Sequence, residues 1–220
     1  MDERNGGRVL VIGRSPGVIL DSADILRGKG FHADATNQFD DVLTDYDAAA
    51  LDVVVFGGMV PPGTKQHLRD EISRVNPHVA FVQGLAGIAG LIAAQVEGVS
   101  STGTDDIAYD AATRTVRLTL GEPAPVVIDA WWATSFRPPE PTSTSLRVLD
   151  SSLEAGDHVV PLPPDVPTVA SFVTVSVGRT VRAFTVGAIP ESVARLVPTG
   201  DPDGPSTLPP VRAVSTHADD

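Results

Sequence analysis

The apolar residues of the first hundred positions follow two alternating patterns. Short runs rich in apolar and β-branched residues, typical of buried strands, occupy residues 9–12, 31–36, 53–56 and 79–82. Between these runs, apolar residues recur at three- and four-residue steps over residues 18–28, 39–50, 65–75 and 85–96, which predicts helices. Because strands that are apolar on both faces and alternate with helices are typical of parallel sheets, we expect an α/β fold: a parallel four-stranded sheet flanked by helices.

The second half of the chain has strand patterns separated by turns, with no helical periodicity longer than a turn. The expected strands cover residues 115–120, 126–132, 145–149, 158–162, 169–177 and 180–186. The last two flank Gly178-Arg179, a dipeptide that favours a tight hairpin. Short strands with proline and glycine turns predict a small all-β, sandwich-like domain.

A change in composition indicates where the two parts meet. Residues 1–100 are rich in glycine and poor in proline, and the order reverses afterwards. The run SSTGTDD at residues 100–106 separates them and is expected to be a linker. We therefore predict an α/β domain over residues 1–99 and an all-β domain over residues 107–190. The proline-rich, acidic residues 191–220 carry few large apolar groups and are expected to form a disordered tail.

Charge and cysteine content exclude several classes of function. The formal net charge is −12, and only two lysines, Lys29 and Lys65, join the arginines, which argues against nucleic acid and anionic membranes as partners. The absence of cysteine excludes disulfides, thiolate metal sites and a cysteine nucleophile. No signal peptide and no membrane-spanning apolar stretch is recognised, so we expect a cytoplasmic protein.

Four segments of the first half resemble a known family. They are residues 9–16 (VLVIGRSP), 30–42 (GFHADATNQFDDV), 52–63 (DVVVFGGMVPPG) and 77–84 (PHVAFVQG). Their order and spacing over residues 8–98 resemble the receiver domain of bacterial response regulators, with Pro61 where the family often has Met-Pro. The resemblance implies a flavodoxin-like fold.

The departures from the receiver pattern concern its chemistry. Receivers hold Mg²⁺ with an acidic pair after the first strand, and these positions are Gly13 and Arg14 here. The phosphoacceptor aspartate falls on Gly57, the switch Ser/Thr falls on Gln83, and no fifth strand with the family's lysine follows. Because phosphoryl transfer to a carboxylate needs that carboxylate and a metal, the resemblance implies a degenerate receiver. Such a module is expected to act by docking a partner, or by binding a ligand other than the phosphoryl group at the carboxyl ends of the strands.

The loop after the first strand allows two interpretations. Ser15 as N-cap with Pro16 at the first helical position is a good local solution for a helix start. The same helix end, with Arg14 beside it, also suits a phosphate, and Asp34 is then a conceivable ribose ligand. The loop lacks the Gly-x-Gly-x-x-Gly pattern, so capping is the simpler interpretation and nucleotide or NAD(P) binding is the alternative.

A second candidate for ligand binding follows the third and fourth strands. Gly57 and Gly58 come directly after one strand and Gln83 ends the next, and ligands of open α/β sheets bind beyond the carboxyl ends of strands. The plainer interpretation is a tight turn made rigid by the two prolines at positions 61 and 62. Together with the loop after the first strand, these positions form the best pocket candidate.

Trp131 and Trp132 are the only tryptophans, and as neighbours on a strand they face opposite sides. Asp129 shares a face with Trp131, so that face is the expected solvent side, and Trp131 is a candidate anchor for a partner. Burial against the α/β half is an equally open interpretation.

Other polar clusters have plain interpretations. The scattered histidines have no metal-ligand spacing, and no Ser/His/Asp set is recognised. One acidic cluster is expected to lie in a solvated linker: Asp105, Asp106 and Asp110. A second is expected to form the solvated face of a helix: Asp40, Asp41, Asp45 and Asp47.

The sequence therefore predicts a non-catalytic regulatory or scaffolding protein that acts by protein–protein docking, with a protein partner or a second copy and without metal or cofactor. The alternatives are a nucleotide- or NAD(P)-binding protein or enzyme, with its ligand at the carboxyl ends of the parallel strands, and an accessory protein of a biosynthetic pathway.

Overall fold

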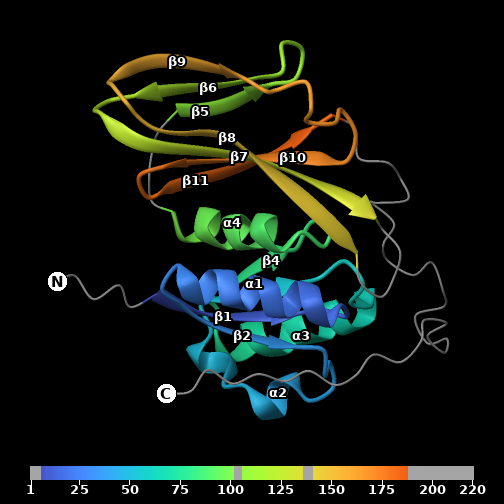
Figure 1. The fold of residues 1–220 in the computed structure, drawn as a ribbon. Helices are drawn as coiled ribbons and strands as arrows, with labels where there is room; N and C mark the ends of the chain where they lie inside the picture. Colours follow the sequence, from blue (N-terminus) through green and yellow to red (C-terminus); the bar gives the residue numbers. More distant parts are fainter. Residues whose placement is uncertain (1–5, 102–105, 136–140, 188–220) are drawn as a thin grey trace.

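The computed structural model describes residues 6–101, 106–135 and 141–187, whose strands form three sheets (Figure 1). One sheet is parallel and has four strands with flanking helices, as expected, and antiparallel sheets follow it. The expected tail over residues 191–220 and most of the expected linker lie outside the described residues. Among the described helices, none has the length and apolar character needed to span a bilayer.

The parallel sheet has the order β2-β1-β3-β4. Its strands are β1 (Gly6–Ile12), β2 (Phe31–Thr36), β3 (Val53–Phe56) and β4 (Ala80–Gln83). The chain moves outward from β1 to β2 and then crosses to β3 on the other side of β1. The carboxyl ends of β1 and β3 therefore mark a topological switch point, the usual place for a ligand in sheets of this kind.

Helices cover both faces of this sheet (Figure 1). One face carries α1 (Pro16–Gly28) and α4 (Ala89–Ser100), and the other carries α2 (Val42–Asp45), the 3₁₀ helix η1 (Ala48–Ala50) and α3 (Pro62–Val75). Successive side chains of β1 alternate between the two faces, and both sets are buried because both faces are covered.

The helix predicted over residues 39–50 was wrong, because only α2 and η1 form there. Asp47 caps η1, since its carboxylate accepts a hydrogen bond from the Ala49 N–H at 3.0 Å. The Asn76 side-chain amide also donates to the carbonyls of Ala48 and Leu51, at 3.2 and 2.6 Å. These side chains take the backbone groups that a continuous helix needs.

The rest of the described chain forms two antiparallel sheets, with the orders β5-β6-β9 and β11-β10-β7-β8. Their strands are β5 (Asp106–Asp110), β6 (Thr115–Leu120), β7 (Ala124–Ser135), β8 (Thr142–Leu153), β9 (Gly156–Pro161), β10 (Ser171–Val177) and β11 (Thr180–Val186). The hairpin at Gly178 is confirmed, with a positive φ of 54° at this glycine. β5 was not predicted. Asp106 and Asp110, which were expected in a solvated linker, are the first and last residues of this strand.

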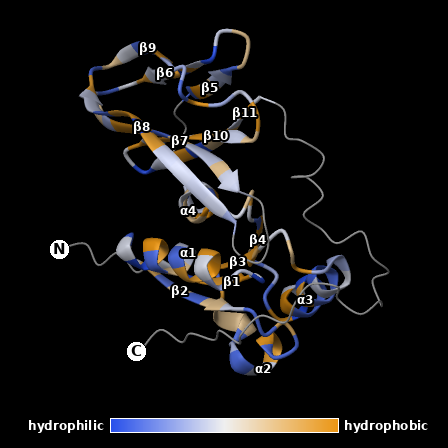
Figure 2. Ribbon diagram, turned by 45° about the vertical axis from the view of Figure 1, so that its right-hand side comes forward, coloured by the Kyte–Doolittle hydropathy of each residue, from blue (hydrophilic) through white to orange (hydrophobic). Residues whose placement is uncertain are grey.

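The two antiparallel sheets share one apolar cluster. Leu118 on β6, Ile128 on β7 and Val175 on β10 are all buried in it. Their strands alternate apolar and polar positions, so the apolar side chains of each sheet point toward the other sheet. In Figure 2, hydrophobic colour is continuous on the parallel strands, whereas the antiparallel strands show a mixture of hydrophobic and hydrophilic residues.

Helix α4 belongs to both halves, because it lies between the parallel sheet and β10–β11 (Figure 1). Ile92 and Val96 pack into the cluster under the parallel sheet. Leu91 instead packs with Phe172 of β10. The helix is buried on opposite sides, so the two halves meet through a continuous apolar contact and not through a solvated gap.

Candidate functional site

The carboxyl ends of β1 and β3 touch each other at two glycines. The Gly57 N–H donates to the Ile12 carbonyl at 2.8 Å. A Cβ atom on Gly57 would lie 3.3 Å from the Gly13 Cα, and one on Gly13 would lie 2.6 Å from Cγ2 of Ile19. Glycine at position 57 therefore lets the two backbones approach, and glycine at position 13 leaves room for the Ile19 side chain. A ligand role for Gly57 or Gly58 stays a prediction.

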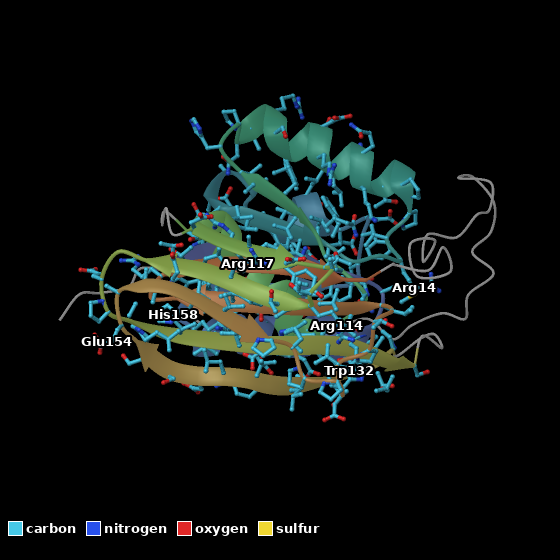
Figure 3. The ribbon with its side chains drawn as sticks, turned by 90° about the horizontal axis from the view of Figure 1, so that it is seen from above. Arg14, Arg114, Arg117, Trp132, Glu154 and His158 are labelled. Carbon is cyan, nitrogen blue, oxygen red and sulfur yellow. The ribbon has the colours of Figure 1, made fainter. Side chains whose placement is uncertain are left out.

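Helix α1 begins as predicted, with Ser15 as N-cap and Pro16 as the first helical residue. The Ser15 carbonyl accepts a hydrogen bond from the Ile19 N–H at 3.1 Å, but the Ser15 side chain makes no capping hydrogen bond. Arg14 lies in the loop between β1 and α1 (Figure 3). Asp34, the conceivable ribose ligand, lies 3.6 Å from the guanidinium of Arg27. Phosphate binding by Arg14 and Ser15 stays a prediction.

Gln83, at the end of β4, lies at the centre of a polar network. Its side-chain amide donates to the Phe56 carbonyl at 2.9 Å, and its side-chain oxygen accepts from Lys65 Nζ at 3.0 Å. Phe56 ends β3 and Lys65 lies in the first turn of α3. Gln83 thus fixes the lysine at the carboxyl edge of the sheet.

Helix α4 holds the loop after β4 from the other side. The Gln95 side chain donates to the Gln83 carbonyl at 3.0 Å and accepts from the Leu85 N–H at 3.2 Å. Within the same loop, Ala86 has a left-handed backbone with φ of 55°. A non-glycine residue in this region costs free energy, and such strain is often found at binding sites. The Gln95 side chain therefore ties the loop after Gln83 to α4.

Arg69 lies one helical turn beyond Lys65 and packs over two aromatic rings. Its guanidinium carbon is 5.5 Å from the Phe56 ring centre and 5.6 Å from that of Phe81. Its Nε is buried and has no hydrogen-bond partner. The faces of the rings stabilise the cation without neutralising it, because aromatic rings carry no net charge.

Lys65, Arg69 and Gln83 together are called the edge cluster below. Partial burial lowers the pKa of Lys65 from its usual value of 10.5, and the positive charge of Arg69 lowers it further. Within the described residues, neither cation forms an ion pair with a carboxylate. An anion placed beside both would relieve their repulsion, so this geometry suits an anionic group.

The lowered pKa of Lys65 gives a testable pH dependence of stability. Between that lowered pKa and 10.5, the unfolded chain holds a proton that the folded chain has released. We therefore expect the free energy of unfolding of the wild type to rise with pH, relative to that of Lys65→Met, across this window. Urea denaturation of both proteins at a series of pH values measures it, and a difference that does not change with pH would contradict the prediction.

Sequence reasoning found Gln83 but missed Lys65 and Arg69. A usable signal was present: positions 65 and 69 share one face of a predicted helix, and the chain has only one other lysine. What the sequence did not reveal is that this face turns toward β4, which depends on the order of the strands.

Both tryptophans are partly buried. The Trp131 ring packs on α4 with Phe172, and its Nε1 donates to Thr174 at 2.9 Å. Of the two interpretations left open, the structure therefore favours burial of Trp131 against the α/β half over a solvent-facing side. Trp132 packs on the cluster between the antiparallel sheets (Figure 3). A role as partner anchor stays a prediction for both.

Within the described residues, no three or more histidine, aspartate or glutamate side chains come close enough together to hold a metal ion. His158 on β9 makes its ring contact with the Glu154 carbonyl, at 2.8 Å (Figure 3). His217 lies outside the described residues.

No family model and no curated protein matches this chain. Among solved structures, it is similar to a glutamine amidotransferase from Thermotoga maritima, with 18% sequence identity over 81% of this chain and 74% of that chain. The TM-score of that match is 0.28, which is too low to carry an argument about fold or function.

Proposed function

We propose that this chain is a non-catalytic regulatory protein whose receiver-like half binds a small anionic ligand at the edge cluster. The observation that carries the proposal is the position of Lys65 at the carboxyl edge of the sheet. Its Nζ donates a hydrogen bond to Oε1 of Gln83 at 3.0 Å. In a receiver, this edge gains negative charge by phosphorylation of an aspartate. Here Gly57 stands at that position, and a bound anion would supply the charge instead.

The charge distribution supports an anionic ligand. The chain carries a formal net charge of −12, so carboxylates are abundant as possible partners for cations. Lys29, for comparison, pairs with Glu97 at 2.9 Å. Lys65 and Arg69 lie side by side without such a partner among the described residues, and Arg69 keeps a buried Nε free of hydrogen bonds. A phosphate or carboxylate group accepts hydrogen bonds from both kinds of side chain.

The antiparallel half gives the proposal its second part. We propose that this half, as a sandwich-like unit attached through α4, presents the surface that docks a protein partner or a second copy. Gln95 of α4 contacts the loop beside the edge cluster, and other α4 residues contact β10 and β11. One helix thus touches both the proposed ligand site and the proposed docking half.

The test uses the two lysines as probes. Reductive methylation with ¹³C-formaldehyde would give one NMR signal for Lys65 and one for Lys29, besides that of the amino terminus. We expect inorganic phosphate, pyrophosphate, ATP or NADPH to shift the Lys65 signal and to raise the pKa of Lys65, leaving Lys29 unaffected. Lys65→Gln should weaken binding about tenfold or more, and Lys29→Gln should not.

The outcomes separate the proposal from its alternative. If none of these anions perturbs the Lys65 signal at about 10 mM, anion binding at the edge cluster is wrong. If a nucleotide binds and Arg14→Gln weakens it while Lys65→Gln does not, the ligand lies at the start of α1, as the nucleotide interpretation of the sequence requires. Sedimentation velocity with and without the bound anion then tests whether a second copy docks.

A further inference from the structure

Strand β8 is the longest edge strand among the described sheets. It has 12 residues and lies at the border of its sheet beside β7, whereas the next longest edge strand, β11, has 7 (Figure 1). Most of its residues are exposed, and no described strand pairs with its free edge. It contains neither proline nor lysine, the residues that commonly prevent an edge strand from pairing. The free edge of β8 is therefore open to a second strand.

The register with β7 shows where the β8 side chains point. Leu149 lies opposite the buried Ile128, so it faces the cluster between the antiparallel sheets, and this side is called the inner face of β8. Val148 is an extra residue that forms a bulge, and it packs on the same cluster. Arg147 and Asp150 form an ion pair on the other side, the outer face. Two successive inner-face residues are therefore flanked by two outer-face residues of opposite charge.

The bulge determines how a second β8 can pair with this edge. Opposite residues of an antiparallel pair share a face of the sheet. Around the bulge, this condition is met when Val148 lies opposite Leu149 of a second copy. A shift by one or two residues in either direction places an inner-face residue opposite an outer-face residue. A regular strand can pair here only with a register shift, as β7 does, whereas an identical strand pairs without one.

The same register matches charges across the interface. When Val148 lies opposite Leu149 of the second copy, Arg147 lies opposite Asp150 of that copy, and symmetry repeats the pair. The register follows from the bulge alone, so the charge match is an independent observation. The Arg147 and Asp150 side chains are 52% and 62% exposed, so a second strand can reach both. Leu146, only partly buried now, would gain cover from that strand together with Val148 and Leu149.

We propose that two copies of this chain form a symmetric dimer in which their β8 strands pair antiparallel along the free edge. Backbone hydrogen bonds then join the two β7–β8 sheets into one continuous sheet. The inference rests on the proposed function, because it names the strand and the occupant for docking by the antiparallel half. The bulge is the feature that favours a second copy over an unrelated strand.

The test is sedimentation velocity of the full-length chain without added phosphate or nucleotide, where we expect a dimer at about 100 µM. Arg147→Asp would place aspartates opposite each other, and Asp150→Arg would place arginines opposite each other. Each variant alone should therefore weaken dimerisation about tenfold or more. In an equal mixture of the two variants, both pairs across the interface again have opposite signs, so a mixed dimer should form.

Arg117→Asp is the matched control for the charge variants. Arg117 lies on β6, in the other antiparallel sheet, and is 57% exposed, close to the value for Arg147. It also forms an exposed ion pair, with Asp110 at 2.9 Å. This variant changes the net charge as much as Arg147→Asp and should leave the dimer unchanged.

A cross-link tests the register directly, because the chain has no cysteine of its own. In the proposed register, Ser145 lies opposite Ser152 of the second copy, and both are on the outer face. Oxidised Ser145→Cys/Ser152→Cys should therefore form a covalent dimer. Ser145→Cys/Ser151→Cys should not, since Ser151 lies opposite the buried Val126 and is on the inner face.

Four results would overturn the proposal: a chain that stays monomeric at about 100 µM, a dimer that neither charge variant weakens, variants that do not associate when mixed, or equal cross-linking of the two cysteine pairs. A dimer insensitive to the β8 variants would leave docking by the antiparallel half standing on another surface. Lys65→Gln should dimerise like the wild type, so the anion site is decided separately by its own test.

Discussion

A Gly90→Val variant is expected to lose about 3 kcal/mol of folding free energy, with a fall in Tm of roughly 6–12 °C for a chain of this length. A Cβ atom on Gly90 would lie 2.2 Å from Cη2 and 2.3 Å from Cζ3 of the Trp131 ring. The ring has little freedom to move away, because it packs with Phe172 and its Nε1 is hydrogen-bonded to Thr174. α4 would therefore be pushed away from β10.

Two probes report this effect from the two halves separately. Both tryptophans lie on β7, so tryptophan fluorescence follows the antiparallel half. All the described α-helices lie within residues 16–100, so helical circular dichroism follows the parallel half. We expect both thermal transitions to coincide in the wild type and to shift together in Gly90→Val, because α4 belongs to both halves.

The control is Gly28→Val, at the end of α1, where a Cβ atom would meet nothing within 4 Å. This variant should change stability by less than about 1 kcal/mol. A comparable loss in both variants would show that the cost comes from placing valine in a helix and not from the ring of Trp131. In the double variant Gly90→Val/Trp131→Ala, the total loss should be smaller than the sum of the losses in the two single variants.

A Phe172→Ala variant is expected to lose about 3–5 kcal/mol, as much as Gly90→Val or more. The Phe172 side chain is 1% exposed and fills the contact between β10 and α4, with Ile88 and Leu91. Its removal leaves a cavity that the surrounding backbone cannot close, since β10 is hydrogen-bonded on both sides. Urea denaturation followed by fluorescence and by circular dichroism measures the loss.

Phe184→Ala on the adjacent strand β11 is the matched control. The same side chain is truncated there, but Phe184 is only partly buried and packs on the cluster between the antiparallel sheets, away from Phe172. We expect its loss to be about half as large. If the control costs as much as Phe172→Ala, the contact between α4 and β10 contributes nothing special to stability.

The fold was largely predictable because its signals are local. The apolar runs that became β1 and β3 are each followed by a glycine. Apolar residues recur at three- and four-residue steps only in the first half, and this difference distinguishes the two halves. The helix over residues 39–50 failed for a non-local reason: Asn76, far away in sequence, takes the carbonyls of Ala48 and Leu51. β5 was missed since its two terminal aspartates look like solvated loop residues, although pairing with β6 makes it a strand.

The candidate site was predictable only in part. The sequence indicated the edge that holds Gln83, because residues that follow parallel strands meet at one edge. It did not indicate Lys65, which lies in a helix and reaches this edge only because α3 packs beside β4. Whether Trp131 is buried depends in the same way on packing between elements. The strand pattern shows which residues share its face, but it does not show that α4 covers that face.

The position of α4 also constrains how such a chain changes over generations. A larger residue at position 90 is acceptable only when the ring at position 131 has already become smaller, so substitutions at these two sites should be inherited as a pair. Recombination that joins either half to an unrelated partner would leave one side of α4 uncovered. Descendants should therefore keep or lose both halves together, and gene fusions should add to the ends of this unit and not interrupt it.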